Sequence, residues 1–233
     1  MSIRDTRPTD GFREAQRHLA GLTARGEKRL LLLLAARTPG WITSDHLTLL
    51  GLASTAACGA LYAASGRHPR LLLVVNLALA LNWLGDSLDG TLARHRGVGR
   101  PRFGFYVDHL ADAFGALFVL AGLAASGLMS PLVAAAVLIA YFLLAIETYL
   151  ATYTIGRFEI SYGPLGGTEL RILLAVANAF VLRRAVWTID GVGWLAFDVL
   201  GAATAAVLAI LAVVSAIRGT RALVRVEGWA PTS

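Results

Sequence analysis

Apolar residues form six segments along this chain, and this pattern predicts helices that cross a membrane. The charge-free run 47–66 has the roughly 20 residues that a helix needs to span a bilayer core. Residues 131–155, interrupted only by Glu147, and residues from about 194 to 217, with Asp198 near the start, have similar lengths. We expect each of these three segments to form one transmembrane helix.

The second and third segments must include charged residues to reach the length of a span. Residues 71–85 are uncharged but too few, so the helix has to continue to about Arg94. Residues 113–130 are also uncharged, and we expect their helix to start earlier, near Phe103. These extensions place four acids inside the two helices: Asp86, Asp89, Asp108 and Asp112.

The fifth segment is the shortest. Only residues 172–182 are uncharged, so this segment can cross a membrane only by including Glu169 and Arg171 at one end. Polar residues in other spans have simpler interpretations. Asn76 and Asn82 predict hydrogen bonds between helices, and Asp198 predicts a local hydrogen bond away from the acid cluster.

The segment before the first span alternates apolar and basic positions at helical spacing from about residue 8 to residue 37. Its run EKRLLLLLAAR is too short to cross a membrane, which predicts an amphipathic helix lying on the inner leaflet. The alternative is an elongated first span, although Pro39 and Gly40 favour a break. The sequence thus predicts an all-α integral membrane protein with six transmembrane helices after an interfacial amphipathic N-terminal helix. The expected divisions are a cytoplasmic N-terminal segment over 1–45, a helical membrane domain over 46–217 and a cytoplasmic tail over 218–233.

Composition and charge support a membrane location and predict an orientation. Apolar residues make up 56% of the chain and charged residues 15%, whereas about 25% is usual in soluble domains. If both termini are cytoplasmic, 17 of the 21 Lys and Arg residues lie on the cytoplasmic side, as the positive-inside rule requires. The net charge of +6 suits anionic lipid headgroups, and no zinc-type spacing or aromatic-basic module indicates a nucleic-acid partner. We therefore expect a multi-pass protein of the inner (plasma) membrane with its acid cluster on the cytoplasmic side.

The four aspartates have the spacing of a shared site. Asp86 and Asp89 are three residues apart and Asp108 and Asp112 are four apart, so each pair projects from one helix face. A short loop with Gly and Pro makes the two helices antiparallel neighbours. Each carboxylate inside a membrane costs about 2.5–3.5 kcal/mol. Protonation or bound divalent cations can offset this cost, and clustered hard oxygen ligands without His or Cys suit Mg²⁺ or Mn²⁺.

Small and basic residues accompany the aspartates. Gly90 and Gly104 leave room for a ligand to approach the helices closely, and Ala93 keeps the same face shallow. Arg94 offers a planar fork of donors that suits phosphate oxygens. These residues favour a phosphate-containing ligand beside the acids.

The complete arrangement resembles the signature of the CDP-alcohol phosphotransferase family. It runs Asp86-x2-Asp89-Gly90-x2-Ala93-Arg94-x9-Gly104-x3-Asp108-x3-Asp112. The resemblance implies a usually dimeric membrane enzyme in which the four aspartates hold two divalent cations. It also implies that Asp112 is the general base and that the donor contacts are Asp86, Gly90, Ala93, Arg94 and Gly104. Ser44 and Asp45 stand where many members have a Pro-Asn pair ahead of a Thr.

The resemblance implies a reaction of phospholipid biosynthesis. We expect transfer of a phosphatidyl group from CDP-diacylglycerol to a polar alcohol, with release of CMP, by a homodimer. Candidate acceptor contacts are Arg157, Glu169 and Arg171, although Arg171 suits a structural ion pair with Glu147 or Glu169 equally well. One alternative is a CDP-choline or CDP-ethanolamine type enzyme acting on a diacylglycerol-like lipid. A divalent-cation transporter is another, disfavoured because the acids cluster at one depth.

Overall fold

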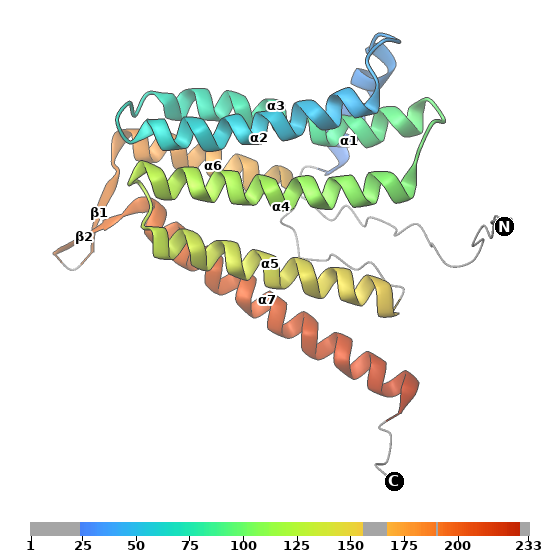
Figure 1. The fold of residues 1–233 in the computed structure, drawn as a ribbon. Coiled ribbons are helices and arrows are strands. Elements are labelled where there is room, and N and C mark those ends of the chain that lie inside the picture. The colour runs from blue at the N-terminus through green and yellow to red at the C-terminus, as the bar shows by residue number, and fades with distance from the viewer. Residues whose placement is uncertain (1–23, 156–166, 190, 229–233) are drawn as a thin grey trace, which may run out of the picture.

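The fold is nearly all helical over the residues described by the computed structural model, which are 24–155, 167–189 and 191–228 (Figure 1). The elements are α1 (Ala24–Arg37), α2 (Ser44–Ser65), α3 (Leu71–His95), α4 (Pro101–Ser126), α5 (Pro131–Ile155), α6 (Gly167–Arg183), β1 (Val186–Ile189), β2 (Val192–Leu195) and α7 (Ala196–Glu227). Helix α2 packs against α3 and α4, α3 packs against α6, and α5 pairs with α7.

Five of the helices in the described ranges are long and apolar enough to cross a membrane: α2, α3, α4, α5 and α7. This is the architecture of an all-α integral membrane protein. Helix α6 has 17 residues, about 26 Å at the helical rise, against a hydrocarbon core of about 30 Å. The sixth predicted span is therefore not confirmed.

The extended second and third spans form as expected. Helix α3 continues through His95 and contains Asp86 and Asp89, and α4 begins at Pro101, which places Asp108 and Asp112 inside it. Proline suits the first turn of a helix because the missing N–H would have no partner there. Helix α4 ends at Ser126, four residues before the predicted end, because Gly127 adopts a left-handed φ of 74°.

The predicted break before the first span is present. Residues 38–43 separate α1 from α2, and Arg96 holds this connection by donating to the carbonyl oxygens of Thr38, Pro39 and Ile42. Helix α1 is thus a separate helix and not the end of an elongated span. It packs against α3, with Leu31 buried in a cluster that includes two residues of α3. The predicted amphipathic region before residue 24 lies outside the described residues.

A two-stranded hairpin between α6 and α7 was not predicted. Strands β1 and β2 pair antiparallel, with Trp187 opposite Trp194, and Gly191 has a φ of 79°. Helix α7 then runs from Ala196 to Glu227, ten residues beyond the predicted end at residue 217, so part of the expected tail is helical. Ala, Leu and Arg are good helix formers, and Gly228 with a φ of 75° follows the last turn.

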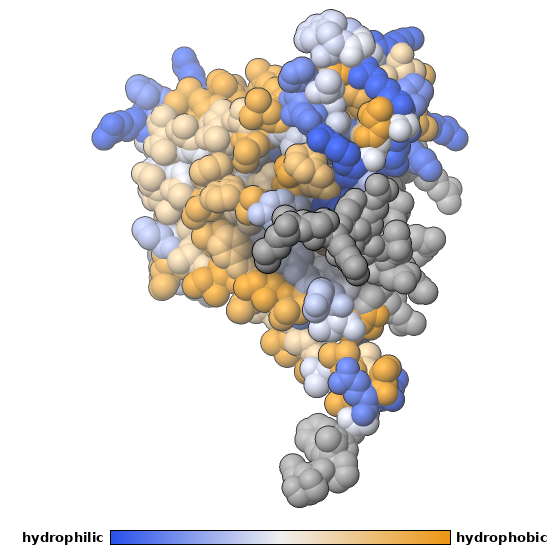
Figure 2. All heavy atoms as spheres, turned by 45° about the vertical axis from the view of Figure 1, so that its right-hand side comes forward, coloured by the Kyte–Doolittle hydropathy of each residue, from blue (hydrophilic) through white to orange (hydrophobic). Residues whose placement is uncertain are grey.

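Hydrophobic side chains cover much of the flank shown in Figure 2, whereas hydrophilic side chains gather where α1 lies (upper right). The helices approach closely where glycines meet. A Cβ atom on Gly122 of α4 would lie 2.1 Å from the carbonyl oxygen of Gly59 in α2. A Cβ atom on Gly85 of α3 would lie 2.5 Å from the backbone nitrogen of Gly51. These contacts fix α2 between α3 and α4, the two helices that contain the aspartates.

Candidate active site

Two cavities that differ in polarity adjoin each other at the aspartates. The first, about 930 Å³, is lined mainly by polar and charged residues of α1, α2, α3, α4 and the α3–α4 loop. The second, about 340 Å³, lies between the helices and is lined mostly by apolar side chains. Four residues line both cavities: Thr48, Asp86, Asp89 and Asp108. Asp112 lines the second cavity. The acids therefore lie at the boundary between a polar and an apolar space.

The other predicted site residues divide between these cavities. Those predicted to contact the donor all line the first cavity: Gly90, Ala93, Arg94 and Gly104. Of the predicted acceptor contacts, Arg171 lines the second cavity, Glu169 lines neither, and Arg157 lies outside the described residues. The structure thus brings together the motif residues and Arg171.

Asp89 is the most deeply buried of the motif carboxylates on α3, with 6% of the residue exposed. It accepts a hydrogen bond from Thr48 Oγ1 at 2.7 Å and another from the backbone N–H of Gly90. Asp86 and Asp108 line the same two cavities as Asp89. A buried carboxylate needs such donors, because burial without partners is costly. Three carboxylates from two helices therefore share one electrostatic environment.

Asp86 has a cationic partner from a distant part of the chain. Arg171 of α6 donates from Nη2 to Asp86 Oδ2 at 2.8 Å and from Nε to Asn82 Oδ1 at 2.7 Å. Asn82 in turn donates to the carbonyl oxygen of Gly51 at 2.9 Å and to Thr55 Oγ1 at 2.8 Å. Asn82 thus makes the predicted contact between helices, and Arg171 pairs with Asp86, a partner that the sequence did not indicate.

The carboxylates fit a divalent cation in chemistry but are not gathered around one point. Among the described residues, no group of three or more His, Cys, Asp and Glu side chains is arranged to hold a metal ion. Asp86 is directed to Arg171 and Asp89 to Thr48. Oxygen donors of this kind are nevertheless those that Mg²⁺ and Mn²⁺ prefer. Metal binding by the four aspartates stays a prediction.

The two glycines of the motif lie beside open space or the end of a long side chain. A Cβ atom on Gly90 would meet only the guanidinium of Arg94, at 3.3 Å from Nη1. A Cβ atom on Gly104 would meet no atom within 4 Å. Both positions therefore leave room beside the helix backbone in the first cavity, and the predicted close approach of a ligand there stays a prediction.

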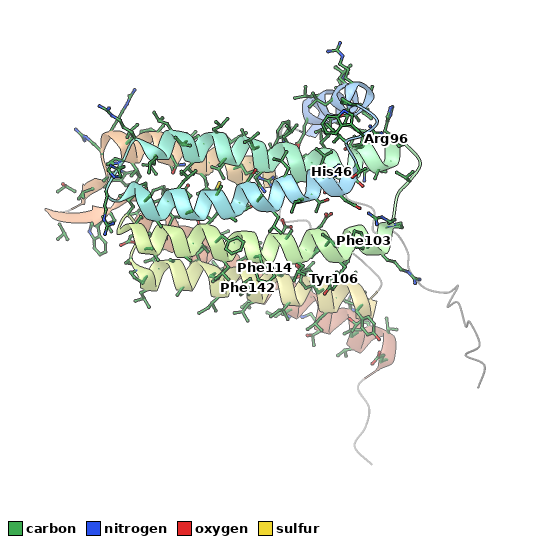
Figure 3. All side chains as sticks on the ribbon, turned by 45° about the horizontal axis from the view of Figure 1, so that its top comes forward. His46, Arg96, Phe103, Tyr106, Phe114 and Phe142 are labelled. Atoms are coloured by element: carbon green, nitrogen blue, oxygen red, sulfur yellow. The ribbon has the colours of Figure 1, made fainter. Side chains whose placement is uncertain are left out.

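The rim of the first cavity contains contacts that sequence reasoning missed. Arg100 in the α3–α4 loop pairs with Asp45 of α2, and its guanidinium lies 4.3 Å from the ring centroid of Phe103. Figure 3 shows Phe103, His46 and Arg96 at this same end of the bundle. Thr48 and Glu27 were also missed, because a single Thr or Glu without a spacing partner gives no signal. Asp45 departs from the Pro-Asn pair of many family members, but the sequence does not indicate that Arg100 is its partner.

No family model matches the chain, and no curated protein matches it. Among solved structures, the backbone is similar to that of a phosphatidylinositol phosphate synthase (PgsA1) from Mycobacterium tuberculosis with CDP-DAG bound. The two chains are 21% identical, and the similarity covers 87% of this chain and 92% of that chain with a TM-score of 0.49. This likeness concerns the fold alone.

Proposed function

We propose that this chain is a membrane-embedded CDP-alcohol phosphatidyltransferase. It transfers a phosphatidyl group from CDP-diacylglycerol to a polar alcohol and releases CMP. The observation that supports this proposal is the meeting of a polar and an apolar cavity at Asp86, Asp89 and Asp108. A donor with a nucleotide at one end and a lipid at the other needs both kinds of space, with its pyrophosphate between them.

The first cavity suits the nucleotide end of the donor. Its volume of about 930 Å³ is within the range of ligand pockets, and Lys28, Arg94 and Arg100 on its walls match the negative charge of a pyrophosphate. The apolar second cavity suits the adjoining part of the lipid. Asp86, Asp89, Asp108 and Asp112 would hold the two divalent cations, Mg²⁺ or Mn²⁺. When bound, these cations neutralise charge on the pyrophosphate and so favour attack by a nucleophile.

The chain's own residues then orient the acceptor and move its proton. The acceptor hydroxyl oxygen forms a bond to the phosphorus that bears the lipid, and the bond from that phosphorus to the CMP oxygen breaks. Asp112 takes the proton of the hydroxyl as general base. Asp112 lines the second cavity, one turn beyond Asp108, and this supports a position near the lipid-bearing phosphorus of the proposed donor. The guanidinium of Arg171 on the same cavity binds an anionic group of the acceptor, with Glu169 and Arg157 as further acceptor contacts.

A donor and acceptor panel tests this function. Purified protein in lipid nanodiscs receives CDP-diacylglycerol with polar alcohols, with and without a phosphate group, and CMP release is measured with Mg²⁺, Mn²⁺ or a chelator. We expect metal-dependent CMP release with at least one acceptor. Release from CDP-choline or CDP-ethanolamine with diacylglycerol alone would assign the lipid to the acceptor instead. Metal flux into proteoliposomes without nucleotide, and no CMP release, would indicate a transporter.

We further propose that the termini and the first cavity are on the cytoplasmic side of the plasma membrane. Cys58 is fully buried, so an introduced cysteine at an exposed position reports accessibility with little background. Trp41→Cys lies before α2 and Arg67→Cys lies after it, at opposite ends of that helix. An impermeant maleimide should label position 41 only in inside-out vesicles and position 67 only in right-side-out vesicles.

The proposal includes a homodimer, and light scattering of the purified protein tests this oligomeric state.

A further inference from the structure

One carboxylate oxygen outside the aspartate motif joins three helices beside the site. Glu27 of α1 accepts hydrogen bonds on Oε1 from Trp83 Nε1 at 2.9 Å and from Thr168 Oγ1 at 2.9 Å. Ser87 Oγ donates to the same oxygen at 3.3 Å. Trp83 and Ser87 belong to α3, and Thr168 belongs to the first turn of α6. A residue of α1 thus connects α3 to α6.

These contacts lie beside the ion pair of the candidate site. On α3, the two donors bracket Asp86 in sequence, and on α6, Thr168 precedes Arg171 by three residues, which places both on one helix face. Arg171 joins the same two helices through Asp86 and Asn82. Two side chains therefore connect the start of α6 to α3. The carboxylate of Glu27 accepts from Thr168, and one turn later in α6 the guanidinium of Arg171 donates to Asp86.

The position of Glu27 is itself fixed by packing. Leu31, one turn further along α1, is 7% exposed, and it is buried in one cluster with Leu88 and Leu92 of α3. Burial of such side chains resists movement of α1 relative to α3. The carboxylate is held at the gap between α3 and α6, and Thr168 is the group of α6 that reaches it.

We propose that Glu27 is a positioning residue that holds the first turn of α6 against α3, so that Arg171 stays beside Asp86. Each of its three donors is an uncharged N–H or O–H group, so an uncharged acceptor oxygen at this position can accept the same hydrogen bonds. The consequence for catalysis rests on the proposed function. Because the guanidinium of Arg171 is proposed to bind an anionic group of the acceptor, loss of Glu27 should raise the KM for the acceptor more than it lowers kcat.

Glu27 also lines the first cavity, which suggests a competing role. If its charge contacts a bound cation or the donor, Glu27→Gln and Glu27→Ala should be equally harmful. If it positions α6 as an acceptor, Glu27→Gln keeps the carbonyl oxygen in the same place and should behave nearly as the unsubstituted protein, whereas Glu27→Ala should not. The amide variant thus separates the two roles.

Hydrogen exchange measured by mass spectrometry on the full chain in nanodiscs, without substrate, tests the positioning directly. We expect Glu27→Ala and Thr168→Val each to increase the opening of the first turn of α6 roughly tenfold, and the double variant to add little. Glu27→Gln should preserve protection. Arg29→Ala is the matched control, since Arg29 is an exposed residue of α1 that lines neither cavity.

Unchanged exchange in both Glu27→Ala and Thr168→Val would overturn the proposal, as would a Gln variant that opens α6 as much as the Ala variant. Thr168→Val removes only the α6 side of the contact, so it still decides the matter if Glu27→Ala does not fold. The exchange measurement does not depend on enzyme activity. If no CMP is released but the exchange result holds, the proposed function fails while the positioning role stands.

Discussion

Arg171 Nη2 lies 2.8 Å from Asp86 Oδ2, and this ion pair joins the start of α6 to the acid cluster of α3. The Arg171 side chain is 18% exposed and that of Asp86 37%. The same guanidinium reaches Asn82, which contacts α2. One arginine therefore connects three helices at the boundary between the two cavities, and it has further N–H groups with which to bind an anion.

Replacing Arg171 by Ala should affect substrate binding more than folding. Because the pair is partly exposed, its loss should change the free energy of unfolding by about 1 kcal/mol or less. Loss of a charge-assisted contact to an anionic acceptor should raise the KM for that acceptor by about tenfold or more. Steady-state CMP release and thermal unfolding in detergent measure the two effects.

The matched control for this prediction is Arg183→Ala at the opposite end of α6. Arg183 is exposed and lines neither cavity. Its substitution should leave the KM unchanged. An equal rise of the KM in both variants would show that net charge, and not the contact at Asp86, determines acceptor binding.

Asp112→Asn should abolish catalysis while the protein still folds. The amide has the shape of the carboxylate but cannot take a proton from the acceptor, and general base catalysis contributes typically 10²–10⁴-fold. We expect kcat to fall by about that range, measured as CMP release at saturating donor. Unchanged turnover would contradict the role of Asp112 and the function proposed for the site.

Asp198→Asn provides the comparison for a carboxylate outside the site. Asp198 of α7 accepts a hydrogen bond from the backbone N–H of Ser130 at 2.6 Å, just before α5. The substitution weakens one hydrogen bond, which should cost about 1 kcal/mol of unfolding free energy. Turnover should stay as in the unsubstituted protein.

The sequence predicted those parts of the fold that depend on local pattern. Long apolar runs predicted the five helices that meet the length and hydropathy of a span, and the length that a span requires placed Asp86 and Asp89 inside α3. The boundary of α7 was wrong because helix-forming residues continue beyond the apolar run. The hairpin was missed although an Asp-Gly pair lies between two short runs with β-branched and aromatic residues, which is a typical signal for such a turn.

Contacts between distant segments could not be predicted from the sequence. Arg171 was a candidate for an ion pair, but its partner depended on how α6 packs against α3, and Asp86 is 85 residues away in sequence. The same holds for Glu27 and Thr168, which are 141 residues apart. A periodic pattern indicates which face of a helix is buried, but it does not identify the helix that covers this face.

A buried polar network away from the acids gives a prediction about stability alone. Tyr62 OH donates to Asn178 Oδ1 at 3.0 Å, and Asn178 Nδ2 donates to Asn76 Oδ1 at 2.7 Å. Tyr62 and Asn178 are fully buried. Asn178→Ala leaves both partners without this contact and should lower the free energy of unfolding by about 1–3 kcal/mol. Tyr62→Phe removes one contact and should cost less. Unfolding in detergent measures both, and CMP release should be retained.

Two glycine substitutions separate helix packing near the site from helix packing far from it. Gly85 directly precedes Asp86, and Gly85→Ala puts a Cβ atom 2.5 Å from the backbone nitrogen of Gly51. Helices α2 and α3 must therefore move apart at this point. Gly122→Ala makes a comparable clash with the carbonyl oxygen of Gly59, and Gly122 lines neither cavity. Each substitution should cost about 1–3 kcal/mol of stability. Only Gly85→Ala should also lower kcat/KM in the folded fraction, because it displaces Asp86 and Thr48 relative to each other. A folded Gly85→Ala variant with full activity would show that the spacing of α2 and α3 does not control the site.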